Sequence, residues 1–171
     1  MLLNLYLKIL RKIILLLRNS PFNLSIKLRY SVYKYLMKSI GKQCNILDCV
    51  VINQPEKVSL GERVSIHQFC YFDSQGDIEI GNNVAIGNHV KLLTSDHIFN
   101  NKKDLIKDQG VETKKIIIKD NVWIGAGVTI LKGVVVGENS IIGAQSLVNK
   151  NVPPNVIAAG VPCKVIKERQ E

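Results

Sequence analysis

The apolar residues of this chain recur at every sixth position from residue 40 onward. The longest uninterrupted run is Ile118, Ile124, Ile130, Val136, Ile142 and Val148. Neither the period of an α-helix nor the alternation of a simple strand places one residue in six on a buried face. A parallel β-helix does, because each hexad forms a short strand with its turn and three hexads close one triangular coil. The pattern predicts an all-β solenoid over residues 40–156 whose coils are stabilised by stacking on one another.

The six-residue pattern is interrupted at three places. The steps 52–60 and 72–80 span eight residues instead of six, and the step 92–118 spans 26. Each interruption follows a third hexad, so all three are expected at the same corner of the column. The longest one is predicted to extrude a loop over residues 95–116. Loops that leave a rigid scaffold often carry function.

The segment 1–39 differs from the rest of the chain in its charge. It holds eight of the 23 basic residues and no acidic one, whereas the remainder has 15 basic and 14 acidic residues. A basic segment favours an anionic surface. Its leucine and isoleucine content favours lipid over nucleic acid, and the chain contains no nucleic-acid-binding motif.

Residues 2–19 are predicted to form an amphipathic helix that Pro21 ends. Charged residues at positions 8, 11 and 12 interrupt the apolar run that a membrane-spanning helix needs. The arrangement also lacks the order and the cleavage site of a signal peptide. Two interpretations remain open, since both use the same apolar stripe. Residues 1–20 either lie in the interface of an anionic membrane or pack on the body or on a sister subunit.

Residues 22–39 fit a second helix better than a strand, because the stretch from Lys34 to Lys38 breaks the strand-like alternation. The expected organisation is a helical segment at 1–39, the β-helix at 40–156 and a C-terminal tail at 157–171. The four cysteines form no Cys-x-x-Cys pair and are expected to be free thiols in a reducing compartment. The expected location is therefore cytoplasmic, with or without peripheral attachment to the inner face of the membrane.

The later coils carry a recognisable motif. Its segments are 121–130 (NVWIGAGVTI), 142–144 (IGA), 152–156 (VPPNV) and 158–166 (AAGVPCKVI). These segments resemble the hexapeptide-repeat acetyltransferases, most closely the galactoside and maltose O-acetyltransferases and related capsule and O-antigen O-acetyltransferases. The resemblance covers residues 40–168. It implies a left-handed β-helix, a homotrimer, acetyl-CoA as donor and no required metal.

The resemblance also implies that His97 is the catalytic base, because the family places a histidine near the start of the extruded loop. Its sequence context is Thr94-Ser-Asp-His97. A histidine titrates near neutral pH and suits removal of a hydroxyl proton. Asp96 or a backbone carbonyl is expected to orient the imidazole. A backbone N–H near Gly125 and Ala126 is expected to stabilise the oxyanion.

The family's coenzyme contacts fall on residues of the later coils. They are Gly125, Ala126, Ala144, Asn149, Lys150, Lys164 and Lys167. The family often has threonine in place of Asn149 and arginine in place of the last two lysines. Lysine still meets a phosphate, but as a point charge without the bidentate fork of arginine.

Three residues are candidate contacts for the acceptor. His67 aligns with an acceptor-contacting asparagine of the galactoside enzymes, or it is a histidine on an outer coil face. Asp73 binds a sugar hydroxyl or caps a turn. Trp123 stacks on a ligand or seals a subunit contact.

The sequence thus predicts acetyl-CoA-dependent O-acetylation of a sugar hydroxyl in surface polysaccharide biosynthesis, with a glycan acceptor near a membrane. One alternative is N-acetylation of an amino sugar. A second is a trimeric zinc hydratase like the β-helical carbonic anhydrases, but the spacings between His67, His89 and His97 do not match that motif. A third is a trimeric scaffold without catalytic activity.

Overall fold

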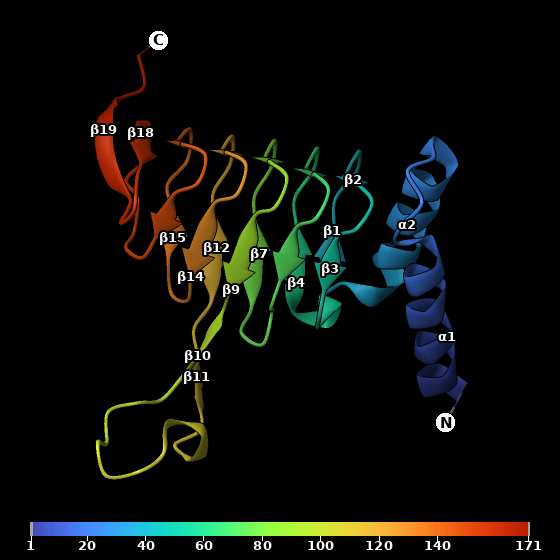
Figure 1. Ribbon diagram of the computed structural model, residues 1–171. Coiled ribbons are helices and arrows are strands. Elements are labelled where there is room, and N and C mark those ends of the chain that lie inside the picture. The colour runs from blue at the N-terminus through green and yellow to red at the C-terminus, as the bar shows by residue number, and fades with distance from the viewer. Residues whose placement is uncertain (1, 171) are drawn as a thin grey trace.

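The computed structural model describes the backbone of residues 2–170 and the side chains of residues 5–170; Met1 and Glu171, at the ends of the predicted N-terminal segment and tail, lie outside them. Two helices, α1 (Leu2–Leu17) and α2 (Asn23–Leu36), stand at one end of a column of β-coils (Figure 1). The predicted β-helix with an N-terminal helical segment and an extruded loop is confirmed.

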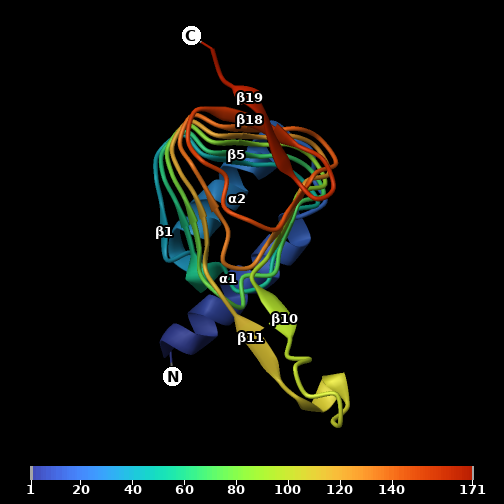
Figure 2. The same ribbon diagram turned by 90° about the vertical axis from the view of Figure 1, so that its left-hand side faces the viewer.

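Three parallel sheets form the sides of the column, which is triangular when viewed along its length (Figure 2). The first sheet holds β1 (Ser39–Ile40), β4 (Val58–Leu60), β7 (Ile78–Ile80), β12 (Ile116–Ile118) and β15 (Val135–Val136). The second holds β2 (Asn45–Ile46), β5 (Ser65–Ile66), β8 (Ala85–Ile86), β13 (Trp123–Ile124), β16 (Ile141–Ile142) and β18 (Val156–Ala159). The third holds β3 (Val51–Ile52), β6 (Tyr71–Phe72), β9 (Lys91–Leu93), β14 (Thr129–Leu131) and β17 (Leu147–Val148).

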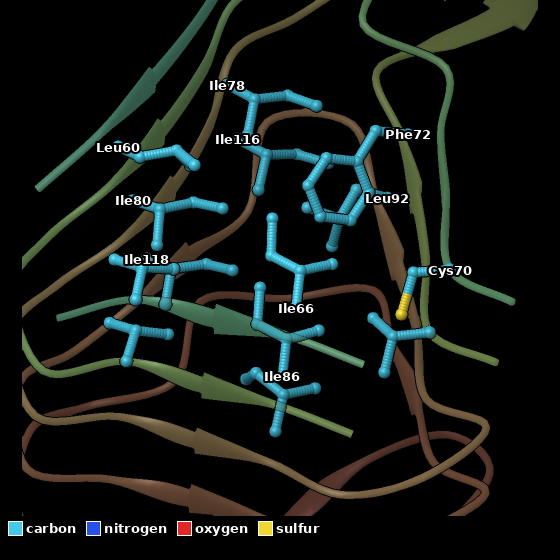
Figure 3. Packing of buried hydrophobic residues seen from close by; sticks show 14 of the residues in the cluster. Leu60, Ile66, Cys70, Phe72, Ile78, Ile80, Ile86, Leu92, Ile116 and Ile118 are labelled. Carbon is cyan, nitrogen blue, oxygen red and sulfur yellow. The ribbon is translucent and has the colours of Figure 1, made fainter. Parts of the chain in front are cut away.

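The sixth-position residues fill the interior of the column. In the second sheet, Ile66, Ile86, Ile124 and Ile142 are partners in successive strands, and each is fully buried. Figure 3 shows Ile66 and Ile86 with their side chains turned inward among those of the other two sheets. Each coil therefore covers the apolar face of the next, as a repeat that cannot bury its core alone requires. Cys70 also points inward, and burial raises the pKa of its thiol to about 11.

All three interruptions of the hexad pattern lie between the third sheet and the first. The first contains the short helix η1 (Pro55–Lys57), and the second joins β6 to β7. The third contains β10 (Ser95–His97), the short helix η2 (Ile106–Asp108) and β11 (Val111–Thr113). β10 and β11 pair antiparallel and form an arm that projects from this corner (Figures 1 and 2).

The predicted tail forms a pair of strands at the far end of the column. β18 adds to the second sheet beside β16, and β19 (Lys164–Glu168) returns antiparallel along β18. An uncovered strand edge would present unpaired backbone groups, and a short strand rich in charge protects it. The sequence pattern does not show this element because β19 lies outside the six-residue period.

Arg29 joins the two helices to the first coil. Its guanidinium donates to the carbonyl oxygens of Leu17 (2.7 Å), the last residue of α1, of Ser20 (2.8 Å), which follows α1, and of Ile46 (2.9 Å) in β2. The side chain is buried, and its Nη2 has no partner among the described residues. Desolvation lowers the pKa of Arg29, and Asp48 counteracts that shift. We refer to α1 and α2 together as the cap. A buried cation thus holds the cap on the column by donating to carbonyl groups at the end of a helix.

Replacing Arg29 with methionine is expected to destabilise the cap. The substitution removes the side-chain donor of three carbonyl groups and leaves those of Ser20 and Ile46 without any donor among the described residues, at a cost of about 3 kcal/mol. Thermal unfolding followed by circular dichroism should show a lower melting temperature. Lys27→Met, at an exposed position of the same helix, is the control and should unfold like the unchanged chain. Equal melting temperatures for the two variants would contradict this role of Arg29.

Candidate active site

His97 is exposed at the end of β10, where its partner in the strand pair is Val111 of β11. The arm begins directly after the third coil and returns to the column through β12. The extruded loop therefore does place this histidine outside the column, as the sequence predicts. Two contacts fix the base of the arm, one on each side of β10.

The first contact is the carboxylate of Asp73, in the preceding coil of the same corner. Its Oδ2 accepts hydrogen bonds from the hydroxyls of Ser95 (2.6 Å) and Thr94 (3.1 Å), and the N–H of Gly76 donates to the Thr94 hydroxyl (2.9 Å). Asp73 is buried. Through Oδ2, Asp73 therefore holds the first residues of the arm.

The second contact is an ion-pair network around Lys132, which follows β14. Its Nζ lies 3.3 Å from Asp96 and 2.5 Å from Glu112, which are partners across β10 and β11. Lys114 also pairs with Glu112, at 3.1 Å. The hydrogen bond from Lys132, together with Lys114, lowers the pKa of Glu112, and the same bond raises the pKa of Lys132. The Lys132 side chain is only 16% exposed, so the column side of this network is partly shielded from solvent.

The structure gives Asp96 a partner other than the His97 imidazole. Its carboxylate pairs with Lys132, and in residues 2–170 it makes no hydrogen bond to His97. The physical reason is strand geometry, because successive side chains of a strand point to opposite sides. Lys132, Glu112 and Lys114 were not identified from sequence. No local motif marks them, since their contacts depend on which coils stack together.

A second group of candidates lies at the corner between the second and third sheets. The N–H of Gly125 donates to the carbonyl of Ile142 (2.8 Å), so that group is used within the column. A Cβ on Gly125 would stand 2.6 Å from the backbone nitrogen of Ala144, which is why this close approach requires glycine. The N–H groups of Ala126 and Ala144 have no acceptor among the described residues.

At the corner between the first and second sheets, the equivalent backbone N–H groups have side-chain acceptors. There the N–H of Asn82 donates to Asp120 Oδ1, and the N–H of Glu62 donates to Asn82 Oδ1, both at 2.8 Å. Side-chain oxygens thus accept hydrogen bonds from the backbone N–H groups of that corner. At Ala126 and Ala144 the methyl side chains cannot do so, which leaves two stacked N–H donors for a ligand.

The predicted coenzyme-binding lysines lie near this row of donors. Lys164 is the partner of Ala159 in the β18–β19 pair, and Ala159 packs against Gly143 of the same corner. Lys167 is the partner of Ile157, and both lysines are exposed. Asn149 and Lys150 are exposed too, but they follow β17 and so lie at the corner between the third sheet and the first.

Trp123 and His67 lie on the second sheet. Trp123 is 56% exposed between Ala85 and Ile141. His67 lines a depression with Ser65 and the start of α2. Within one chain, neither residue lies at the corner that carries the arm.

The three histidines do not come together. His89 stacks on Phe69 with ring centroids 4.9 Å apart, and His67 and His97 lie at different corners. Over the described part of the chain, no cluster of three histidine, cysteine or acidic side chains is arranged to hold a metal ion. The structure thus offers no support for the zinc-hydratase alternative.

Comparison with known proteins agrees with the fold and the motifs. The family described as bacterial transferase hexapeptide (six repeats) matches residues 115–150. The galactoside O-acetyltransferase of Escherichia coli K12 is 35% identical over 82% of this chain and 68% of its own. The chain belongs to the hexapeptide-repeat acetyltransferase family. The predicted class, an acyltransferase, is confirmed.

Two solved structures of this family superpose on nearly the whole chain. A galactoside acetyltransferase in complex with coenzyme A is 30% identical, with a TM-score of 0.86 over 98% of this chain and 82% of its own. A maltose O-acetyltransferase from Clostridium difficile 630 is 32% identical, with a TM-score of 0.84 over 99% and 89%. The chain spans about two thirds of the length of the curated galactoside enzymes.

Replacing Lys132 with methionine is expected to loosen the arm. Turnover should fall about tenfold to a hundredfold, because a displacement of about 1 Å at a reacting group has that effect. Amide hydrogen exchange in β10 and β11 should become faster. Lys115→Met is a matched control, since it removes an ion pair with Glu79 (2.7 Å) on the outside of the first sheet. Unchanged exchange in the arm of the Lys132 variant would disprove the anchoring role.

Proposed function

We propose that this protein transfers the acetyl group of acetyl-CoA to a sugar hydroxyl, with His97 as the general base. The observation that carries the proposal is the exposed imidazole at the end of a strand that Asp73 and Lys132 both hold in place. A histidine on a rigid support suits proton transfer in a defined geometry.

The reaction needs one proton transfer in each direction. The neutral imidazole takes the proton of the acceptor hydroxyl as its oxygen attacks the thioester carbonyl. The carbonyl oxygen becomes negatively charged and accepts a hydrogen bond from a backbone N–H such as that of Ala126. When the carbon–sulfur bond breaks, the imidazolium returns its proton to the departing sulfur. The products are the acetyl ester and CoA.

The donor site is proposed along the corner that carries Ala126 and Ala144. Their N–H groups are free to bind polar atoms of the coenzyme, and Lys164 and Lys167 supply positive charge for its phosphates. The coenzyme A complex of the similar galactoside acetyltransferase supports this ligand class.

A homotrimer is proposed to complete the active site. In one chain, the arm and the Ala126 corner lie at opposite ends of the strands of the third sheet. A base and a thioester must be within hydrogen-bonding distance of one acceptor oxygen. The arm of one subunit and the donor corner of another satisfy this requirement if the subunits pack side by side, with Asn149, Lys150, His67 or Trp123 at the same boundary.

The acceptor is proposed to be a surface polysaccharide or its precursor, modified in the cytoplasm next to the membrane. Among the described residues, no helix is both long and apolar enough to cross a bilayer. The basic, leucine-rich residues 1–20 support peripheral attachment to the inner face of the membrane.

Replacing His97 with alanine is expected to lower the rate of acetyl transfer about 10²- to 10⁴-fold, the usual contribution of a general base. The assay follows thioester consumption with glycans and nucleotide sugars as acceptors. Coenzyme affinity, measured by calorimetry, should stay unchanged. The control is His89→Asn, because asparagine tolerates the positive φ of 59° at that turn.

Other outcomes would identify the alternatives. Full activity of the His97 variant would refute the catalytic role of His97, and the absence of any coenzyme binding would favour a scaffold. A clear preference for amino sugars over their hydroxyl counterparts would favour N-acetylation.

A further inference from the structure

The two-helix cap leaves many apolar side chains exposed after it has packed on the column. Leu10 and Ile14 of α1 are buried, so one side of the helix is used for packing. A second set of side chains remains exposed, and we refer to it as the end-cap surface. It comprises Leu5, Tyr6, Ile9 and Leu16 of α1, the connecting Phe22, and Leu24, Leu28 and Tyr35 of α2.

Most of these exposed residues form one stripe on each helix, whereas Leu15 of α1, which is 58% exposed, lies outside it. In α1, Leu5, Ile9 and Leu16 follow helical spacing and are 57%, 48% and 82% exposed. In α2, Leu24 and Leu28 are one turn apart and are 67% and 43% exposed. These side chains lie outside the buried core that joins the helices to the column. Exposed apolar groups on this scale mark an interaction surface.

One aromatic contact links the exposed residues of the two helices. The rings of Tyr6 and Tyr35 meet edge to face, with centroids 6.2 Å apart, and join α1 to α2. Both helices stand at the same end of the column (Figure 1). The end-cap surface is therefore a single surface made by two helices and not a property of α1 alone.

Lysines accompany the end-cap surface, and α1 and α2 contain no acidic residue, although Glu56 of η1 pairs with Arg11 of α1. Lys8 and Lys12 on α1 and Lys27 and Lys34 on α2 are exposed, and none forms a salt bridge within the described part of the chain. The first acidic residue of the sequence is Asp48. A cationic rim around an apolar centre complements anionic headgroups above acyl chains.

We propose that the end-cap surface docks on an anionic lipid bilayer, with the apolar side chains of both helices inserted among the lipids. The inference rests on the proposed peripheral attachment and extends it from residues 1–20 to α2. It also answers the question that the helix pattern leaves open, because α1 packs on the body with one side and keeps another for lipid. A second copy of the chain fits this surface poorly. Face-to-face pairing would bring the lysines of both copies together, and neither helix supplies an acidic residue to offset their repulsion.

Docking through the cap would determine the distance between the arm and the lipid surface. The arm leaves the third coil, two coils from the cap, and neighbouring coils are about 4.8 Å apart. With a helix layer of about 10 Å, the base of the arm lies roughly 20 Å from the lipid surface. This separation fits an acceptor glycan that remains attached to a lipid carrier.

Binding of the full chain to vesicles tests the proposal. Co-sedimentation uses phosphatidylcholine vesicles with and without phosphatidylglycerol. The unchanged protein should bind the anionic vesicles at least about tenfold more tightly than the neutral ones. No preference for anionic vesicles would overturn the proposal.

Two apolar variants separate the contributions of the helices. Ile9→Gln with Leu16→Gln removes part of the α1 stripe, and Leu24→Gln with Leu28→Gln removes part of the α2 stripe. All four positions are exposed, so unchanged circular dichroism melting is expected for both. Each pair should weaken anionic-vesicle binding about tenfold. Loss only in the α1 variant would overturn the two-helix surface while leaving attachment through residues 1–20 standing, and acetyl transfer in solution should be unaffected in either case.

A charge-matched pair of variants tests the lysines. Lys8→Gln, Lys12→Gln and Lys27→Gln together should reduce binding to anionic vesicles and make it less sensitive to salt. The control removes three lysines from the arm, at Lys102, Lys103 and Lys107, and should bind like the unchanged chain. Equal loss in both triple variants would show non-specific attraction and overturn the proposal. A second result would also overturn the proposal. If the mass of the protein assembly without lipid doubles as the protein concentration rises, and does not double in the Leu24 and Leu28 variant, the surface binds a second copy of the assembly.

Discussion

Stacking of one apolar side chain per hexad, coil upon coil, is the interaction on which the rest of this molecule depends. Ile66, Ile86, Ile124 and Ile142 are buried by one another along the second sheet, and equivalent rows line the other two. The corners are therefore held at regular positions by the core. Insertions at one corner leave that core intact, which is why the arm can be long without disturbing the column.

The arm shows how a rigid column can hold a single imidazole outside itself. The contacts come from two different coils: Asp73 precedes the arm in sequence, and Lys132 follows it. Both act on the base of the arm and not on His97 directly. A loop held at its base by a buried carboxylate and a partly shielded ion pair places His97 at little further cost in entropy on binding. Within a trimer, this arrangement would deliver the base to a neighbouring subunit's coenzyme.

The two ends of the column are covered by different elements. At the C-terminal end, β19 covers the edge of β18 with a short, charged strand. At the N-terminal end, two helices cover the first coil and Arg29 ties them to it through three carbonyl groups. The cap has more apolar surface than this task needs, and the excess lies beside unpaired lysines. Covering the core uses one side of the helices, and the proposed contact with lipid would use another.

The sequence by itself determined the column, its corners, the position of the arm and the family, because each follows from a local repeat or a contiguous motif. Only the tertiary structure decided what Asp73 and Asp96 contact, that the last residues form a strand pair, and which side of α1 is packed. These features join residues far apart in the chain. Lys132 meets Asp96 only because the coils stack in one register and because neighbouring strand residues point to opposite sides. A hexad repeat encodes the stacking, but it does not encode which polar side chains the stacking brings together.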